Sequence, residues 1–115
     1  MKKNLEQIRA KNALGVARGM DKKCVNKVPA RIMCNGLLAA ASFALDKAGE
    51  DLAVFEKAIL PHLMSMEKIQ QTQLRKFIEE LAEKDSANLR EITTESLAYL
   101  NYLRRYAVKS SKKES

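Results

Sequence analysis

The sequence has few of the residues that metal sites and catalytic centres require. Among its 115 residues there is one histidine, His62, and the two cysteines, Cys24 and Cys34, lack a Cys-x-x-Cys spacing. This set argues against a structural zinc site, which needs four such ligands. The four glycines are scattered through helical patterns and form no phosphate-binding loop. We therefore predict a protein that is not an enzyme, has no cofactor or metal, and uses no small-molecule substrate.

The sequence is also poor in material for β-sheets, export and membrane insertion. Four glycines, two prolines and few β-branched runs leave little for strands and hairpins. Met-Lys-Lys leads into a charged amphipathic segment and not into the apolar core of a secretory signal. The two cysteines are expected to be free thiols, as in cytosolic proteins. These absences predict an all-α, cytoplasmic protein without a membrane partner.

Apolar residues at helical spacing divide the chain into about five helices. The first is expected over residues 3–20, the second from Pro29 to about residue 47, and the third from Glu50 to about Met64. Residues 65–72 form the least defined connection. Leu74 to Leu81 mark a short fourth helix, and Asp85 or Ser86 can cap the last one. We predict a compact single-domain helical bundle over residues 1–109, followed by a flexible basic tail at 110–115.

The second helix is predicted to lie at the centre of the core. Proline is tolerated in the first turn of a helix, so Pro29 marks the start. The fourteen residues from Ile32 to Leu45 carry no charge, a pattern typical of a helix buried on most sides. They fall short of the roughly 20 residues that cross a bilayer. Gly36 lies inside this helix, where glycine is unfavourable, and we expect it to serve close packing.

Positive charge is concentrated in the first third of the chain and near its end. The net charge is +7. Residues 1–35 hold nine Lys or Arg against two acids, residues 36–84 hold six against eight, and residues 85–115 hold six against four. This asymmetry favours a polyanionic partner, with nucleic acid as the first candidate.

Two helix faces are basic or polar without any acid, one on the first helix and one on the last. Each is either a solvated face or a surface for a polyanion, and the lack of interspersed glutamates keeps the second interpretation open. The residues of these faces are Asn4, Gln7, Lys11, Arg18 and Lys22 on the first helix, and Arg90, Thr94, Asn101, Arg105 and Lys109 on the last.

Three segments together carry a family resemblance. A Leu-Glu-Gln-Ile-Arg-Ala opening is followed by a Val-Pro-x-x-Ile-x-x-Asn-Gly-Leu pattern and, about fifty residues later, by a C-terminal helix with its own motif. Their order and spacing resemble the small subunit of the type III-B CRISPR effector, the RNA-guided Cmr complex. The residues are Leu5–Ala10; Val28, Pro29, Ile32, Asn35, Gly36 and Leu37; and Asp85, Arg90, Thr93, Glu95, Leu97, Leu100 and Leu103–Ala107.

The resemblance implies an all-helical subunit without enzymatic activity, of which several copies stack into a minor filament. Its implied partners are the other effector subunits, further copies of itself, the guide RNA and the target RNA. The resemblance implies no catalytic residue in this chain. Basic positions that line the filament are the implied nucleic-acid-binding residues, and here they correspond to Lys27, Arg31, Arg90, Arg104 and Arg105.

Other interpretations remain open at this point. Some of these arginines could pair with acids of the same chain or of a neighbouring subunit. A free-standing helical DNA-binding regulator is the first alternative function, although residues 30–45 are too apolar for a recognition helix. A protein-only adaptor is the second.

Overall fold

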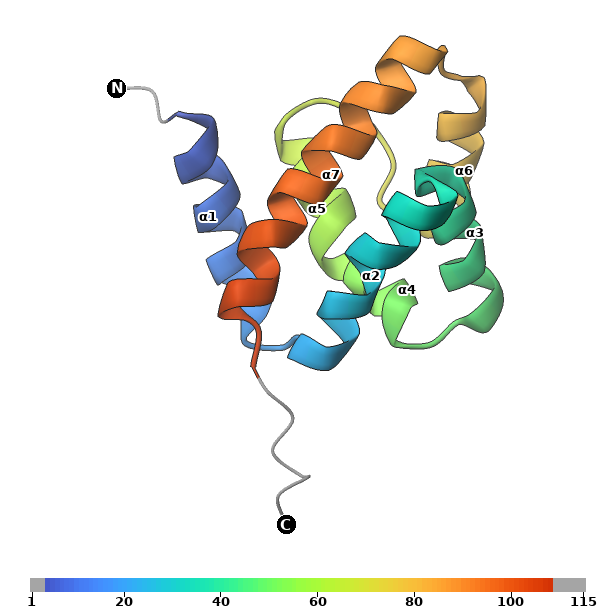
Figure 1. The fold of residues 1–115 in the computed structure, drawn as a ribbon. Helices are drawn as coiled ribbons and strands as arrows, with labels where there is room; N and C mark the ends of the chain where they lie inside the picture. Colours follow the sequence, from blue (N-terminus) through green and yellow to red (C-terminus); the bar gives the residue numbers. More distant parts are fainter. Residues whose placement is uncertain (1–3, 109–115) are drawn as a thin grey trace.

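The computed structural model describes residues 4–108, and within this range the protein is all-α (Figure 1). The prediction of an all-α fold is confirmed, with six helices in place of about five and no strand among the described residues. The expected tail at 110–115, and Lys109 at the end of the basic face on the last helix, lie outside the described residues. The helical elements are α1 Leu5–Ala17, α2 Lys22–Asn35, α3 Leu37–Lys47, α4 Glu50–Val54 with a π-turn at Phe55–Ile59 and α5 Leu60–Ser65, α6 Leu74–Glu83, and α7 Ser86–Tyr106.

Helix α1 begins at a capping box and runs beside α7. The Asn4 side chain accepts a hydrogen bond from the backbone N–H of Gln7, whose own side chain accepts one from the N–H of Asn4. This pairing satisfies two N–H groups that a helix start leaves free. Past the end of α1, the N–H of Lys22 donates to the carbonyl of Val108 and the N–H of Val108 donates to that of Met20. These bonds join the end of α7 to the α1–α2 connection.

The predicted central helix is two helices, and its expected start is wrong. Helix α2 begins at Lys22, where the Asp21 side chain caps it, so Pro29 lies inside the helix. Gly36 separates α2 from α3 with φ +93° and ψ 158°, a backbone conformation open almost only to glycine. Nothing lies within 4 Å of a Cβ added at Gly36. Glycine is therefore required here for a sharp change of direction and not for close packing.

The break also changes which residues of the uncharged stretch are buried. Helix α3 packs with its small side chains against α2 and α6, so only one face of it enters the core. Met33 is 74% exposed, and Cys34 and Phe43 are exposed as well. The prediction of burial on most sides is wrong for these positions. The buried residues of the stretch are Ile32, Leu37, Ala40, Ala41 and Ala44.

The third predicted helix is confirmed, with a π-turn in its middle. Helix α4, the π-turn and α5 follow one another without interruption over Glu50–Ser65. The N–H of Leu60 donates to the carbonyl of Phe55, five residues earlier, and Pro61 follows without an N–H to donate. A π-turn of this kind accommodates an irregular step inside a helix. Helical spacing predicts a core stripe of Leu52, Phe55, Ile59 and Leu63. The last three are buried, whereas Leu52 is half-buried.

Helices α6 and α7 start at carboxylate caps. Glu56 accepts a hydrogen bond from the N–H of Leu74 at 2.8 Å, and Asp85 accepts one from the N–H of Asn88 at 2.8 Å. Negative charge at a helix start is favourable because the N–H groups there are unpaired. Helical spacing predicts a buried stripe on α7, and this stripe is confirmed as buried except at Leu89, which is half-buried. Its residues are Leu89, Ile92, Ser96, Leu100, Leu103 and Ala107. Glu95 and Tyr99 are also buried.

Candidate nucleic-acid interface

The outward face of α7 lies between α1 and α2 (Figure 1), which pack along its two sides. Arg90, Thr94, Asn101 and Arg105 are exposed on this face, as their spacing predicts. Within residues 4–108, neither arginine forms an ion pair. We call these four residues the α7 strip. Its cations are therefore available to a partner from outside the chain.

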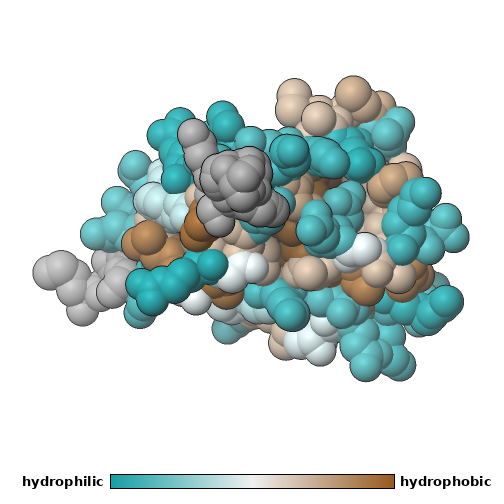
Figure 2. Space-filling model, turned by 90° about the horizontal axis from the view of Figure 1, so that it is seen from below, coloured by the Kyte–Doolittle hydropathy of each residue, from teal (hydrophilic) through white to brown (hydrophobic). Residues whose placement is uncertain are grey.

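The polar face of α1 is exposed too. Asn4, Gln7, Lys11 and Arg18 are accessible to solvent, and Leu14 is exposed among them. From below, Figure 2 shows a surface on which hydrophilic residues predominate, with hydrophobic residues in separate patches between them. The basic face predicted on the first helix is thus on the surface except at Lys22, which is half-buried and begins α2 instead.

Arg31 is engaged within the chain. Its Nε lies 3.3 Å from Oδ2 of Asp51, and its guanidinium carbon lies 4.3 Å from the ring centroid of Phe43. The Nε is buried and lacks hydrogen-bond geometry toward any partner, so the contact with Asp51 is an ion pair. The arginine thus links α2, α3 and α4. A phosphate would have to compete with both contacts, whereas Lys27, four residues earlier, is exposed.

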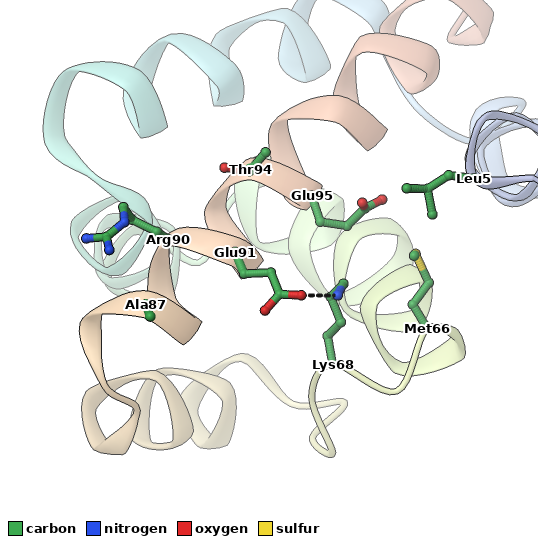
Figure 3. A pocket seen from close by; sticks show the side chains of 8 residues that line it. All are labelled: Leu5, Met66, Lys68, Ala87, Arg90, Glu91, Thr94 and Glu95. Carbon is green, nitrogen blue, oxygen red and sulfur yellow. Dashed lines mark hydrogen bonds and ion pairs between the residues drawn. The ribbon is translucent and has the colours of Figure 1, made fainter.

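Arg90, Arg104 and Arg105 are not one cluster. Fourteen residues separate Arg90 from Arg104, which is about 21 Å along a helix axis. Arg90 borders a hollow beside Thr94, and its guanidinium points away from the hydrogen-bonded pair of Lys68 and Glu91 (Figure 3). Arg104 lies near the other end of α7, in a groove against α2. The three predicted arginines of α7 therefore lie at separate points along the helix and do not form a single binding site.

Sequence reasoning missed a buried ionic network that joins α1, α5 and α7. Glu95 is only 4% exposed. It accepts hydrogen bonds from Nε of Arg9 at 2.9 Å and from Nη2 of Arg9 at 2.7 Å. Nε2 of His62 donates to the same carboxylate at 2.8 Å. Burial alone would raise the pKa of Glu95, but the bonds from Arg9 and His62 outweigh it and hold the pKa below its usual 4.5.

The contacts around His62 show which nitrogen of the neutral ring carries the proton. Nδ1 lies 2.9 Å from the side-chain nitrogen of Asn12, which can only donate, so Nδ1 accepts while Nε2–H donates to Glu95. Tyr99 stacks on the imidazole with ring centroids 4.1 Å apart. Burial lowers the pKa of His62 below its usual 6.5 and also favours the neutral ring. Both ring nitrogens are thus occupied by contacts within the chain.

A local signal for this network exists in the sequence. Glu95 falls within the apolar stripe of α7, three residues after Ile92 and five before Leu100. An acid in a buried stripe requires a partner that neutralises it. The partner cannot be read locally, because Arg9 lies 86 residues away in the chain. Since each oxygen of Glu95 accepts a hydrogen bond from another helix, the network is suited to holding α1, α5 and α7 together.

Residues 4–108 contain no group of three His, Cys, Asp or Glu side chains placed to hold a metal ion. In the same range no helix is both long and apolar enough to span a bilayer. Within these residues, the fold and the surface define a small all-helical protein with basic helix faces and a buried network of Arg9, Glu95 and His62. The family model described as CRISPR-associated protein (Cas_Cmr5) matches residues 2–110, and the chain belongs to this family, the small subunit of the type III-B Cmr complex. No curated protein and no solved structure matches the chain.

Proposed function

We propose that this protein is the non-catalytic minor-filament subunit of its type III-B effector. In this proposal copies of residues 1–109, acting as one domain, stack beside the backbone subunits. They contact guide and target RNA through basic helix faces without reading sequence. The observation that carries the proposal is the α7 strip, which presents Arg90 and Arg105 to solvent with no ion pair to either within residues 4–108.

The chemistry of the strip suits the phosphate backbone. Arginine guanidinium groups bind phosphates through several N–H donors. The contact energy comes largely from the release of counterions and does not depend on base identity. Thr94 and Asn101 add neutral hydrogen-bonding groups between the two cations. Such a surface can hold a nucleic acid at many positions, as a subunit repeated along a guide–target duplex must.

The experiment is target-RNA capture by the reconstituted effector that contains the Arg90→Glu/Arg105→Glu variant. We expect weaker capture at an unchanged melting temperature, because exposed charges contribute only about 0–1 kcal/mol to stability. The matched control is Arg75→Glu/Lys76→Glu, which makes the same charge change at two exposed positions of α6.

Three results would count against the proposal. Equal capture by the variant and the control would exclude the α7 strip. An effector that assembles with the subunit but gains no RNA affinity from it would favour the protein-only adaptor. Tight binding of the free subunit to one DNA sequence, persisting at high salt, would favour the regulator.

A further inference from the structure

A groove of about 480 Å³ runs between α2 and α7, next to the α7 strip. Asn101 belongs to both the groove and the strip, so the two surfaces are continuous. We call this feature the α2–α7 groove. Its lining residues are Asn26, Pro29, Ala30 and Met33 from α2, and Leu97, Asn101 and Arg104 from α7.

The groove is open to an anionic partner. None of its seven lining residues is an acid. Arg104 is exposed and forms no ion pair within residues 4–108. Its Nε donates to the side-chain oxygen of Asn101 at 3.5 Å, so the guanidinium is tied to a second lining residue of the groove. A single cation without a neutralising acid favours a ligand with one negative charge at this point.

The rest of the lining is neutral and of two kinds. Asn26 and Asn101 carry carboxamides, which both donate and accept hydrogen bonds. Pro29, Ala30 and Met33 form an apolar wall, on which the Met33 side chain is 74% exposed. A flexible, polarizable methionine adapts to flat aromatic surfaces. A nucleotide combines these same three features, with an anionic phosphate, a hydrogen-bonding base edge and a flat base face.

We propose that the α2–α7 groove holds a short single-stranded segment of RNA, with a phosphate on Arg104 and a base against Met33. The carboxamides of Asn26 and Asn101, which line the same groove, bind the sugar or the base edge. The proposal rests on the RNA contact proposed above and assigns to it a definite surface. The contact at Arg104 depends on charge and the contact at Met33 does not, so the two can be measured separately.

The first test measures binding of the full chain to a fluorescein-labelled 15-mer of uridine at several salt concentrations. Arg104→Gln should weaken binding and reduce the log–log salt slope by about 0.7, the value for one phosphate contact on a single strand. Met33→Ala should weaken binding with the slope unchanged, because no counterion is released at an apolar contact. The matched control Arg75→Gln removes an exposed arginine of α6, away from the groove, and should leave affinity and slope close to those of the unaltered chain.

The second test uses the assembled effector with target RNA that contains 4-thiouridine. On irradiation, we expect cross-links in the peptides that contain Met33 or Leu97. Cross-links confined to other peptides, together with Arg104→Gln behaving like Arg75→Gln, would overturn the groove while leaving RNA contact by the subunit intact. A wild-type chain that neither binds nor cross-links to RNA would overturn both proposals. Protection of Met33 by another subunit of the effector would show that a protein occupies the groove.

Discussion

The substitution Glu95→Ala tests the buried network most directly. It removes the carboxylate that accepts both hydrogen bonds from Arg9 and the one from His62. The guanidinium of Arg9 would then lack its counter-ion, and the buried Nε2–H of His62 would lack its acceptor. A buried donor without a partner costs more than the net value of the bond that it made.

The expected cost is about 3 kcal/mol. Removing one member of a buried ion pair typically destabilises a protein by about 3–5 kcal/mol. The lower end applies here because the side chain of Arg9 is 20% exposed and can recover some hydration. For a chain of this length, 3 kcal/mol corresponds to a decrease in melting temperature of roughly 12 °C.

The assay is urea unfolding of the full chain followed by far-UV circular dichroism. Glu91→Ala is the matched control, because it makes the same substitution one turn earlier on α7. There the carboxylate is 61% exposed and bonded to Lys68, so the cost should be about 0–1 kcal/mol. A double-mutant cycle with Arg9→Met should give a coupling free energy of about 1–3 kcal/mol. If Glu95→Ala costs no more than Glu91→Ala, the network is solvated and the reasoning is wrong.

Three further predictions follow from the same structure. The folded-state pKa of His62 lies below 6.5 and that of Glu95 lies below 4.5. The free energy of unfolding should therefore decrease as the pH falls below about 6.5, and again below about 4.5. In a pH series of urea titrations, His62→Gln should remove the first decrease. Burial, followed by the nearby carboxylate of Asp51, raises the pKa of Cys24 to about 12. Cys34 is exposed, so iodoacetamide should label one thiol per native chain at neutral pH, and mass spectrometry that finds Cys24 labelled first would contradict this. Gly36→Ala and Gly36→Leu should each cost about 1–3 kcal/mol through backbone strain, and a much larger cost for Leu in thermal unfolding would indicate close packing instead.

The helical class and most of the helices followed from local patterns in the sequence, but the division of the uncharged stretch into α2 and α3 did not. The spacing of Ile92, Leu100 and Leu103 fixes one buried face of α7 whatever lies against it, since side chains three and four residues apart share a helix face. Asp85 caps α7 because its carboxylate reaches an N–H only three residues away. The exposure of Arg90 and Arg105 follows from the same periodicity, on the opposite side of the helix.

The prediction of a single central helix was wrong because it depended on the backbone conformation of Gly36. Gly36 within an uncharged stretch fits a buried helix as well as it fits a helix break, and hydrophobicity does not distinguish them. The φ of +93° at Gly36 is set by how α2 and α3 pack against different neighbours. Proline favours the first turn of a helix, so the sequence predicts a helix start at Pro29, yet α2 contains this residue in its interior.

The sequence by itself determined that this chain is helical, which faces of its helices are apolar, where its cations concentrate and which family it resembles, because each of these is encoded in residues close together in the chain. The tertiary structure decided which charges remain available to a partner. Arg9 pairs with Glu95 across 86 residues and Arg31 pairs with Asp51 across a helix break, whereas Arg90, Arg104 and Arg105 have no ion pair within residues 4–108. Charge can be counted along a chain, but the neutralisation of a charge depends on distances of a few ångströms, and only the folded packing sets those distances.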